Sequence, residues 1–387
     1  MNLIHHGLSF FYRKYRQFVS KLIVLFTNID QNKIIFWADN FKHYGCNPKY
    51  ISEEIAKHTD YEIIWAFDKK FDFQQNLPYK LVKFGSLKYL YHINTAKFIV
   101  TNQLIDESFV IWKKRVGQIL IMTWHGTFPL KRIMGDVRQD APFINRMTKE
   151  SNKCDLILSD SNWFSNLLRR SFWYRGEILN KGIPRNDVFY NVKLKKEAAK
   201  KVRSYYNLAD DTKVVLYAPT FRNNHDRTPY IYDWQVIYEA FEKRYSEPIS
   251  ILIRLHPNMI GTKESNSILN NRHNVISVTD YDDMQELLCV ADVLITDYST
   301  SMFDISLASK PCLLYTPDYN TYDRGTYFNL NSLPFPIAYN IQDLISNIIH
   351  FNEEDIVNNQ TAFLNEVFNP IINPRASFEV VKWILSK

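Results

Sequence analysis

From Lys33 onward, short apolar runs alternate with segments whose apolar residues recur at helical spacing. The runs that read as strands are KIIFWAD, YEIIWAF, KFIVTN, QILIMTW and CDLILSD. The helical segments between and after them are PKYISEEIAKH, SLKYLYHINTA and NWFSNLLRRSFWY. Nearly continuous apolar strands separated by amphipathic helices are typical of a parallel sheet covered on both faces. The first part of the chain is therefore predicted to be an α/β domain.

The same alternation begins again after a charged segment, residues 191–213, which contains the predicted helix KLKKEAAKKVRSYY. The later strands are KVVLYAPT, ISILIRLHP, NVISVT, DVLITD and PCLLYT. Two open parallel sheets in series predict two Rossmann-type domains with a ligand cleft at the carboxyl ends of their strands. We place the first domain at residues 31–190 and the second at 191–370, and we expect a C-terminal helix within 371–387 to pack back on the first domain.

The first 30 residues have their own pattern. Their apolar residues recur at helical spacing and form a stripe of Leu8, Phe11, Tyr15, Phe18, Leu22 and Leu25. The basic and polar residues fall mainly on the other side of the helix: Arg13, Lys14, Arg16, Gln17 and Lys21. A helix of this kind is suited to lying in a membrane interface. The alternative is a helix docked on the protein's own core. The apolar run Leu22–Phe26 is far shorter than the roughly 20 residues that span a bilayer.

Composition adds constraints on partners and location. The chain has 387 residues, 46% of them hydrophobic, which is enough for two globular cores. A net charge of +6 suits anionic substrates and an anionic membrane surface, but it is too dispersed to indicate a nucleic-acid binder. The four cysteines are far apart, and three adjoin apolar segments, so we expect reduced thiols. Without a visible signal peptide, this predicts a cytoplasmic protein on the inner face of the membrane.

Neither GxGxxG nor GxxxxGK[ST] follows a predicted strand, so a bound nucleotide would need a different loop chemistry. The first candidate cluster is TWHGTFPLKRIMGD, directly after the strand QILIM. His125 at the strand exit can take a proton from a hydroxyl at neutral pH, unless it only ends the strand. Gly126 and Thr127 follow it, and Lys131 adds positive charge.

A second cluster, KGIPRNDVFY, contains Arg185 and Asp187. These residues belong to the acceptor side of the cleft or are structural, and the second interpretation is favoured because Gly, Pro, Asn and Asp form turns in any protein.

In the second half, polar residues again follow strands. Thr220 and Arg222 come after KVVLY, and Arg254 and His256 alternate at the end of ISILIRLHP. An arginine fork binds two oxygens of a diphosphate.

The segment LITDYSTSMFDISLASKP places Ser299, Thr300 and Ser301 at a helix start, with Ser301 and Asp304 resembling a capping box. Free amides, the helix dipole and hydroxyls make an anion site there, and capping alone is the alternative.

In this order, these segments resemble the CDP-glycerol glycerophosphotransferase family, the teichoic acid and capsule polyol-phosphate transferases. The matching stretch runs from about Thr123 to Tyr322, about half of the chain. The resemblance implies a GT-B-like fold in which the second domain holds most of the CDP-polyol. It implies His125 as general base and His256 at the donor diphosphate. Ser299, Thr300 and Ser301 would meet the phosphates, with help from Arg222. The sequence departs from the family pattern where Phe128 separates the HGT segment from Pro129.

The implied reaction moves a polyol phosphate from CDP-glycerol or CDP-ribitol to a hydroxyl of a cell-envelope polymer or its lipid-linked precursor, and releases CMP. We expect no tightly bound cofactor: no Asp/His cluster has metal-ligand spacing, although a loosely held Mg²⁺ is compatible with the chain. Two other hypotheses stand beside it. One is a GT-B glycosyltransferase that uses a nucleotide sugar. The other is a non-catalytic scaffold of an envelope assembly complex, but a scaffold would not need the two histidines at strand exits. The sequence leaves glycerol and ribitol both open.

Overall fold

The computed structural model describes residues 2–68, 77–126, 128–222, 229–256, 259, 268, 274–322 and 325–387. Within these residues, the first domain is a parallel sheet in the order β3-β2-β1-β4-β5-β6-β7. The strands are β1 Asp30–Trp37, β2 Glu62–Phe67, β3 Lys80–Lys83, β4 Ala96–Thr101, β5 Ile119–Met122, β6 Leu156–Ser159 and β7 Glu177–Asn180. The order reverses direction between β1 and β4, which is where ligands bind in open α/β sheets.

The second domain repeats this plan with the order β10-β9-β8-β11-β12-β13, again parallel throughout. Its strands are β8 Lys213–Tyr217, β9 Ile249–Ile253, β10 Val275–Ser277, β11 Val293–Thr296, β12 Cys312–Tyr315 and β13 Ile337–Ala338. The two-domain α/β prediction agrees with this topology. The edge strands β3 and β7, together with the helix α5 Ala141–Ser151, were not predicted. The two edge strands are short and carry exposed residues, so they lack the continuous apolar pattern of the inner strands.

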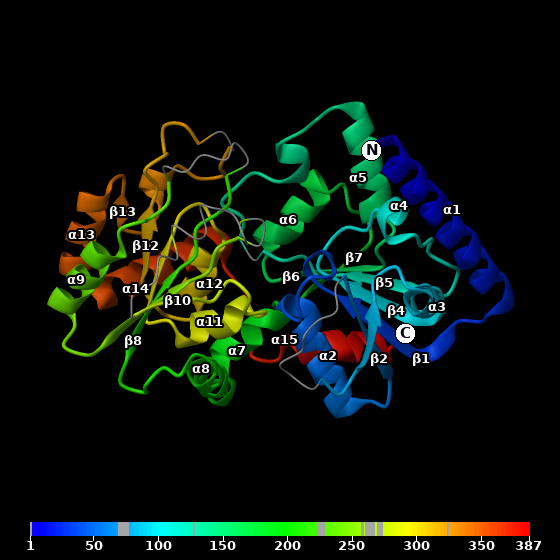
Figure 1. Ribbon diagram of the computed structural model, residues 1–387, viewed down its shortest axis with the longest axis horizontal. Coiled ribbons are helices and arrows are strands. Elements are labelled where there is room, and N and C mark those ends of the chain that lie inside the picture. The colour runs from blue at the N-terminus through cyan, green and yellow to red at the C-terminus, as the bar shows by residue number, and fades with distance from the viewer. Residues whose placement is uncertain are drawn as a thin grey trace.

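Helices cover both faces of each sheet (Figure 1). In the first domain, α2 Cys46–His58 packs with α15 Ala376–Leu385 on one face, while α3 Leu87–Thr95 and α6 Asn162–Ser171 cover the other. In the second, α9 Trp234–Arg244 and α13 Ile341–His350 cover one face. The opposite face is covered by α8 Val192–Tyr206, α11 Met284–Val290, α12 Ser301–Leu307 and α14 Glu353–Phe363, with the short π-helix Leu364–Phe368.

The chain passes from one domain to the other and back again. It enters the second domain through α7 Asp187–Tyr190, whose Val188 and Phe189 belong to the second core. It returns near Ile371, whose N–H donates to the carbonyl of Asp160 in the first domain. There, Asp187 accepts from the backbone N–H groups of Ala376 and Ser377, at 2.8 and 2.9 Å. This contact satisfies the free amides at the start of α15 and fixes the helix against α2.

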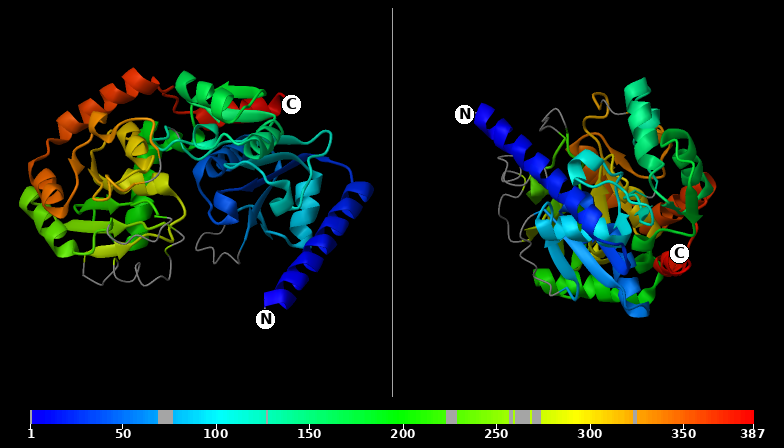
Figure 2. Two further views of the ribbon diagram at one scale, coloured as in Figure 1. Left: turned by 90° about the horizontal axis from the view of Figure 1, so that it is seen from above. Right: turned by 90° about the vertical axis from the view of Figure 1, so that its right-hand side faces the viewer.

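Helix α1, Asn2–Phe26, lies along the outside of the first domain, away from the second (Figure 2). One side of it is docked: Val19 and Ile23 pack against the first core beside α3. The predicted apolar stripe is on another side, where Tyr15 and Leu25 are 53% and 74% exposed. The helix thus both docks on the core and presents an apolar face. The side chains of Leu8 and Phe11, part of the predicted stripe, lie outside the described residues. Among the described residues, no helix is long and apolar enough to cross a membrane.

Candidate active site between the two domains

The carboxyl ends of both sheets face a cavity of about 390 Å³. Residues from four of the predicted segments and from the KGIPRND turn line it: Lys131, Arg185, Thr220, Arg254, His256, Ser299, Thr300, Ser301 and Asp304. The fold therefore gathers residues up to 173 positions apart, because parallel strands present their carboxyl ends at one edge.

His125 follows β5 on the first-domain side of this cleft. Its Nδ1 lies 3.1 Å from the carbonyl oxygen of Asn102, the residue after β4. A carbonyl only accepts, so Nδ1 carries the proton and the lone pair of Nε2 is left to take another. Loss of water around the ring lowers the pKa of His125 below its usual value, and the nearby carboxylate of Asp39 opposes this change. The histidine is therefore a neutral base at pH 7.

Asp39 is a part of the site that the sequence analysis missed. Its carboxylate accepts from the Asn102 amide at 2.8 Å, and its backbone N–H donates to the amide oxygen of Asn102 at 3.0 Å. Asp39, Asn40 and Phe41 have φ angles of 48°, 55° and 66°, a left-handed run that costs energy for side-chain-bearing residues. Such strain is typical of functional loops. The available signal was the polar Asp–Asn pair immediately after the apolar strand KIIFW, since these two residue types tolerate this conformation best.

Arg185 ties the two domains together at the floor of the cleft. Its Nη2 lies 2.9 Å from both oxygens of Asp304 on α12, and its Nη1 donates to the carbonyl of His125 at 3.0 Å. Its backbone N–H donates to Asn47, whose amide in turn donates to the carbonyl of Trp124. Arg185 thus fixes the histidine loop relative to the second domain. The N-cap residue of α12 is Thr300, so Ser301 does not occupy the N-cap position that the predicted capping box with Asp304 requires.

Of the remaining first-domain residues, Asp187 caps α15, as described above, and burial raises its pKa to about 6. This position favours the structural interpretation of Asp187. Gly126 faces the second domain, since a Cβ placed on it would lie 3.7 Å from Thr300. That separation is an ordinary contact, so it shows that the two loops meet without demanding glycine. Thr127 lies outside the described residues.

Phe128, the residue that departs from the family pattern, is fully buried. Its ring stacks on Phe368 with centroids 4.2 Å apart and meets Phe303 edge-on, so it inserts into the core of the second domain. The loop after His125 is therefore anchored on both domains.

Arg222 does not line the cavity, contrary to the expectation that it contacts the diphosphate. Its side chain is buried, with Nε 2.6 Å from Asp318 and Nη1 2.9 Å from Asp297. Two carboxylates thus hold the guanidinium behind the strand ends. Thr220 does line the cavity, but its N–H and hydroxyl both donate to Asp297. This cluster supports the loop after β8 instead of presenting a charge to the cleft.

Arg254, in contrast, lines the cavity and donates to backbone carbonyls, at 2.6 Å to Tyr281 and 3.5 Å to Asp282. Within the described part of the chain, no carboxylate pairs with it. Desolvation lowers the pKa of Arg254, and the nearby carboxylates of Asp283, Asp39 and Asp282 oppose this change without cancelling it. The side chain of His256 is largely exposed, and its ring centroid lies 5.5 Å from that of Phe221. The pKa of His256 is lowered by partial loss of water and by the neighbouring Lys42 and Lys131.

Ser299, Thr300 and Ser301 form the turn into α12. The Ser301 N–H and hydroxyl both donate to the Ser299 hydroxyl oxygen, at 3.3 and 2.9 Å. Thr300 is the N-cap residue, and its side chain makes no capping bond. The hydroxyls of this turn stand beside Arg254, His256 and Lys131 in the same cavity. A base on one side and cations with hydroxyls on the other are the components that phosphoryl transfer requires.

The comparison with known proteins agrees with this chemistry. The model of the CDP-glycerol:poly(glycerophosphate) glycerophosphotransferase family matches residues 19–386. The chain belongs to this family. The match extends well beyond the stretch on which the resemblance was first noted, and it confirms the predicted family and enzyme class.

Individual relatives point the same way. The chain is 28% identical to the teichoic acid poly(glycerol phosphate) polymerase of Bacillus spizizenii over 337 residues, which covers 82% of this chain and 83% of that protein. It is 30% identical to the enzyme of the same name from Staphylococcus epidermidis over 80% of its own length but only 44% of that protein. A solved structure of the wall teichoic acid polymerase TagF superposes with a TM-score of 0.82 at 28% identity, covering 96% of this chain and 93% of that one. This similarity confirms the predicted GT-B-like fold.

In the described part of the chain, no three His, Cys, Asp or Glu side chains are grouped so as to hold a metal ion. Among the described residues that line the cleft, the basic side chains are those of Lys131, Arg185, Arg254 and His256.

Proposed function

We propose that this glycerophosphotransferase transfers glycerol phosphate from CDP-glycerol to a hydroxyl of a teichoic-acid-like or capsular polymer or its lipid-linked precursor, and releases CMP. The observation that carries this proposal is the division of the cleft. A histidine whose Nε2 makes no hydrogen bond to the described residues stands on the first domain, opposite cations and hydroxyls on the second. The family description names CDP-glycerol, and two relatives are named as poly(glycerol phosphate) polymerases, which supports this donor and product.

In the proposed reaction, an acceptor hydroxyl gives its proton to Nε2 of His125 and its oxygen attacks the phosphorus that bears glycerol. The new P–O bond forms as the bond to the CMP oxygen breaks, and CMP leaves with that electron pair. The Asn102 carbonyl and the Asp39 carboxylate behind it hold the ring orientation and stabilise the imidazolium that forms.

The second-domain residues would meet the negative charge of the donor. Arg254 and His256 of the second domain, joined by Lys131 from the first-domain loop after β5, surround the space beside the hydroxyls of Ser299, Thr300 and Ser301. Placing the diphosphate there brings it opposite Gly126, next to the histidine. Positioning and electrostatic stabilisation of this kind supply most of what phosphoryl transfer needs. Arg222 and Arg185 support the walls of the site through their carboxylate partners.

We also propose that the enzyme works at the cytoplasmic surface of the membrane, attached through α1. Its exposed apolar residues are Tyr15, Phe18, Leu22, Leu25 and Phe26. They form one face of a helix whose other face is docked, and this is the arrangement of an interfacial helix. The four cysteines, all buried and unpaired, are compatible with a reducing compartment.

The test is CMP release by purified protein given CDP-glycerol, CDP-ribitol or UDP-glucose in separate reactions, each with a membrane lipid extract as acceptor. We expect CMP from CDP-glycerol. Turnover of CDP-ribitol alone would show that the donor is CDP-ribitol and not CDP-glycerol. Release of UDP alone would move the chain to the sugar transferases, and silence with all three donors would favour the scaffold hypothesis.

A further inference from the structure

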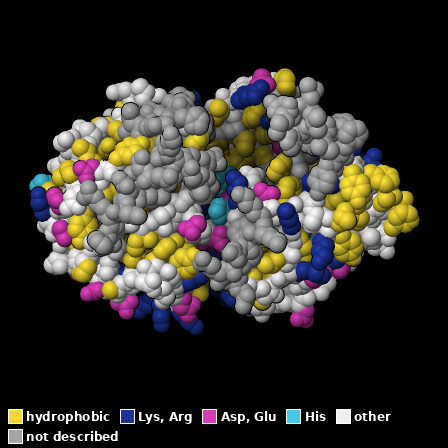
Figure 3. All heavy atoms as spheres, viewed as in Figure 1, with side chains coloured by type: hydrophobic (Ala, Val, Ile, Leu, Met, Phe, Trp, Pro, Cys, Tyr) yellow, Lys and Arg dark blue, Asp and Glu magenta, His cyan; other side chains and the backbone are white. Residues whose placement is uncertain are grey.

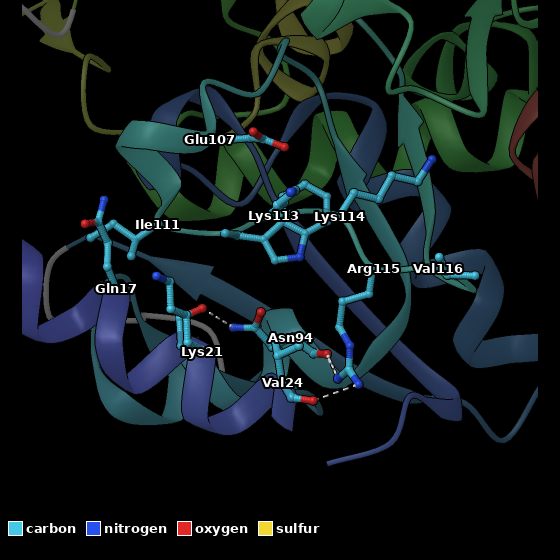
Figure 4. Close-up of a pocket in the computed structure, with 12 residues that line it drawn as sticks. Gln17, Lys21, Val24, Asn94, Glu107, Ile111, Lys113, Lys114, Arg115 and Val116 are labelled. Carbon is cyan, nitrogen blue, oxygen red and sulfur yellow. Dashed lines mark hydrogen bonds between the residues drawn. The ribbon is translucent and has the colours of Figure 1, made fainter. Parts of the chain in front are cut away.

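A second cavity, of about 910 Å³, lies beside α1 on the first domain. Its walls are Gln17, Ser20, Lys21 and Val24 on α1, Asn94 at the end of α3, and Glu107 with residues 111–116 in the connection between β4 and β5 (Figure 4). Residues 113–116 precede the amino end of β5, whereas His125 follows its carboxyl end. The cavity is therefore separate from the catalytic cleft and shares none of its lining residues.

The geometry of this cavity is fixed because α1 is fastened to the domain. Arg115 donates to the carbonyls of Val24 and Thr27 at the C-terminal end of α1, at 3.2 and 2.6 Å, and to the carbonyl of Asn94 at 2.8 Å. The amide of Asn94 donates to the buried Ser20 hydroxyl at 3.0 Å. Arg115 thereby satisfies free carbonyls at the helix end with a cation, which the helix dipole favours.

The lining of the cavity is cationic. Lys114 is held by Asp155 at 2.5 Å, and the one acidic lining residue, Glu107, is held by Lys153 at 3.1 Å. Lys21 and Lys113 are exposed and, within the described part of the chain, make no salt bridge. Figure 4 shows Lys21 reaching from α1 toward the 111–115 segment. These two lysines, together with an acidic lining residue that is itself paired, give the described lining of the cavity a net positive charge, which attracts a small anion.

The apolar face of α1 adjoins this cationic cavity. Phe18 and Leu25 lie three positions before and four positions after the lining residue Lys21, on the same side of α1, and both are exposed; Val116 in the opposite wall is fully exposed. Figure 3 shows hydrophobic side chains gathered at the edge of the molecule where α1 lies. An apolar strip beside a cationic cavity is complementary to a molecule with an anionic head and an apolar tail.

We propose that this cavity binds the phosphate headgroup of an anionic membrane phospholipid. The site deepens the proposed membrane attachment: the apolar face of α1 enters the interface, and Lys21 and Lys113 then contact one phosphodiester. The attachment is thereby selective for anionic lipid and sets the orientation of the first domain on the membrane. It is independent of the transfer reaction.

The test uses short-chain lipids as monomers, so that general attraction to a charged surface does not contribute. Binding of dihexanoyl phosphatidylglycerol to the full-length protein, below its micelle concentration, is measured by calorimetry. Dihexanoyl phosphatidylcholine and glycerol 3-phosphate serve as comparisons. We expect saturable binding of phosphatidylglycerol that is at least about tenfold tighter than that of the other two, because charge-assisted bonds and apolar contact must combine.

The variant Lys21→Ala/Lys113→Ala should weaken phosphatidylglycerol binding by at least about tenfold. The matched control Arg13→Ala/Lys14→Ala removes the same charge from exposed positions of α1 outside the cavity, and should leave this binding unchanged. Equal effects of the two variants, or equal binding of phosphatidylcholine, would overturn the proposal. Glycerol 3-phosphate binding as tightly as the lipid would identify a soluble-phosphate site instead.

CMP release from CDP-glycerol with a soluble acceptor separates this proposal from the proposed reaction. Lys21→Ala/Lys113→Ala should keep that activity, since neither lysine lines the cleft. If the wild type binds lipid but does not release CMP, only the proposed reaction is rejected. If it releases CMP but does not bind lipid, only the lipid site is rejected.

Discussion

The two sides of the interdomain cleft are built on different principles. On the first domain, a single titratable ring is oriented by hydrogen bonds: Asp39 holds Asn102, and Asn102 holds His125. On the second domain, neighbouring strands end in arginines with opposite roles. Arg222 after β8 is enclosed by two carboxylates, whereas Arg254 after β9 contacts carbonyls only within the described residues. An arginine is therefore available to a ligand only where the surrounding loops bring no carboxylate to it.

The largest effect should come from the first-domain side. His125→Ala removes the base, so turnover with CDP-glycerol should fall by about 10²–10⁴-fold, while donor affinity changes little. Initial rates of CMP release, together with donor binding by calorimetry, separate the two quantities. Normal turnover with weakened donor binding in this variant would show that His125 binds the donor. The two sides of the cleft would then not differ in role.

On the second-domain side, Arg222→Met tests the structural member of the arginine pair. It leaves Asp297 and Asp318 buried without their cation, so the free energy of unfolding should fall by about 3–5 kcal/mol. Urea denaturation measures this loss. The KM for CDP-glycerol, determined below the melting transition, should stay within about threefold. A large increase in KM in a stably folded variant would show that Arg222 reaches the donor after all.

Arg254→Met is the matched change in the other arginine. Loss of a charged hydrogen-bond donor to phosphate should raise the Kd for CDP-glycerol by about 10–100-fold. The free energy of unfolding should change much less than in Arg222→Met, because no buried carboxylate is left unpaired. Calorimetry and urea denaturation of both variants side by side give the comparison, and equal stability losses would contradict it.

The smallest effect should come from Asp39→Asn, which keeps the acceptor for the Asn102 amide but removes the charge. The Asp39 carboxylate raises the pKa of His125, so its loss should lower that pKa further. Since the neutral imidazole is the active form, the acid limb of the kcat/KM profile should move to lower pH, by less than about one unit. A pH–rate profile of both proteins shows this directly. An unmoved acid limb would mean that Asp39 only holds the loop.

Much of the site was predictable because the chemistry-bearing residues follow recognisable strands. His125, Arg254, His256 and Ser299 each stand shortly after an apolar run, and parallel strands bring such positions together. Asp39 occupies an equivalent position after β1, but its only signal, the Asp–Asn pair, is common in the turns of any protein. Arg222 was predicted at the donor because its sequence context resembles that of Arg254. Its ion pair with Asp318, 96 positions away, could not be predicted from the sequence.

The sequence by itself determined the two α/β domains and the family, because strand periodicity and short ordered motifs are local properties of the chain. Only the tertiary structure decided which charges remain available. Ion pairing depends on side chains that are distant in sequence, as in Arg185 with Asp304 and Arg222 with Asp318. The tertiary structure also decided that α1 docks by one face and presents another beside a cationic cavity. A periodic sequence pattern shows that a helix has an apolar face, but it does not show what covers that face.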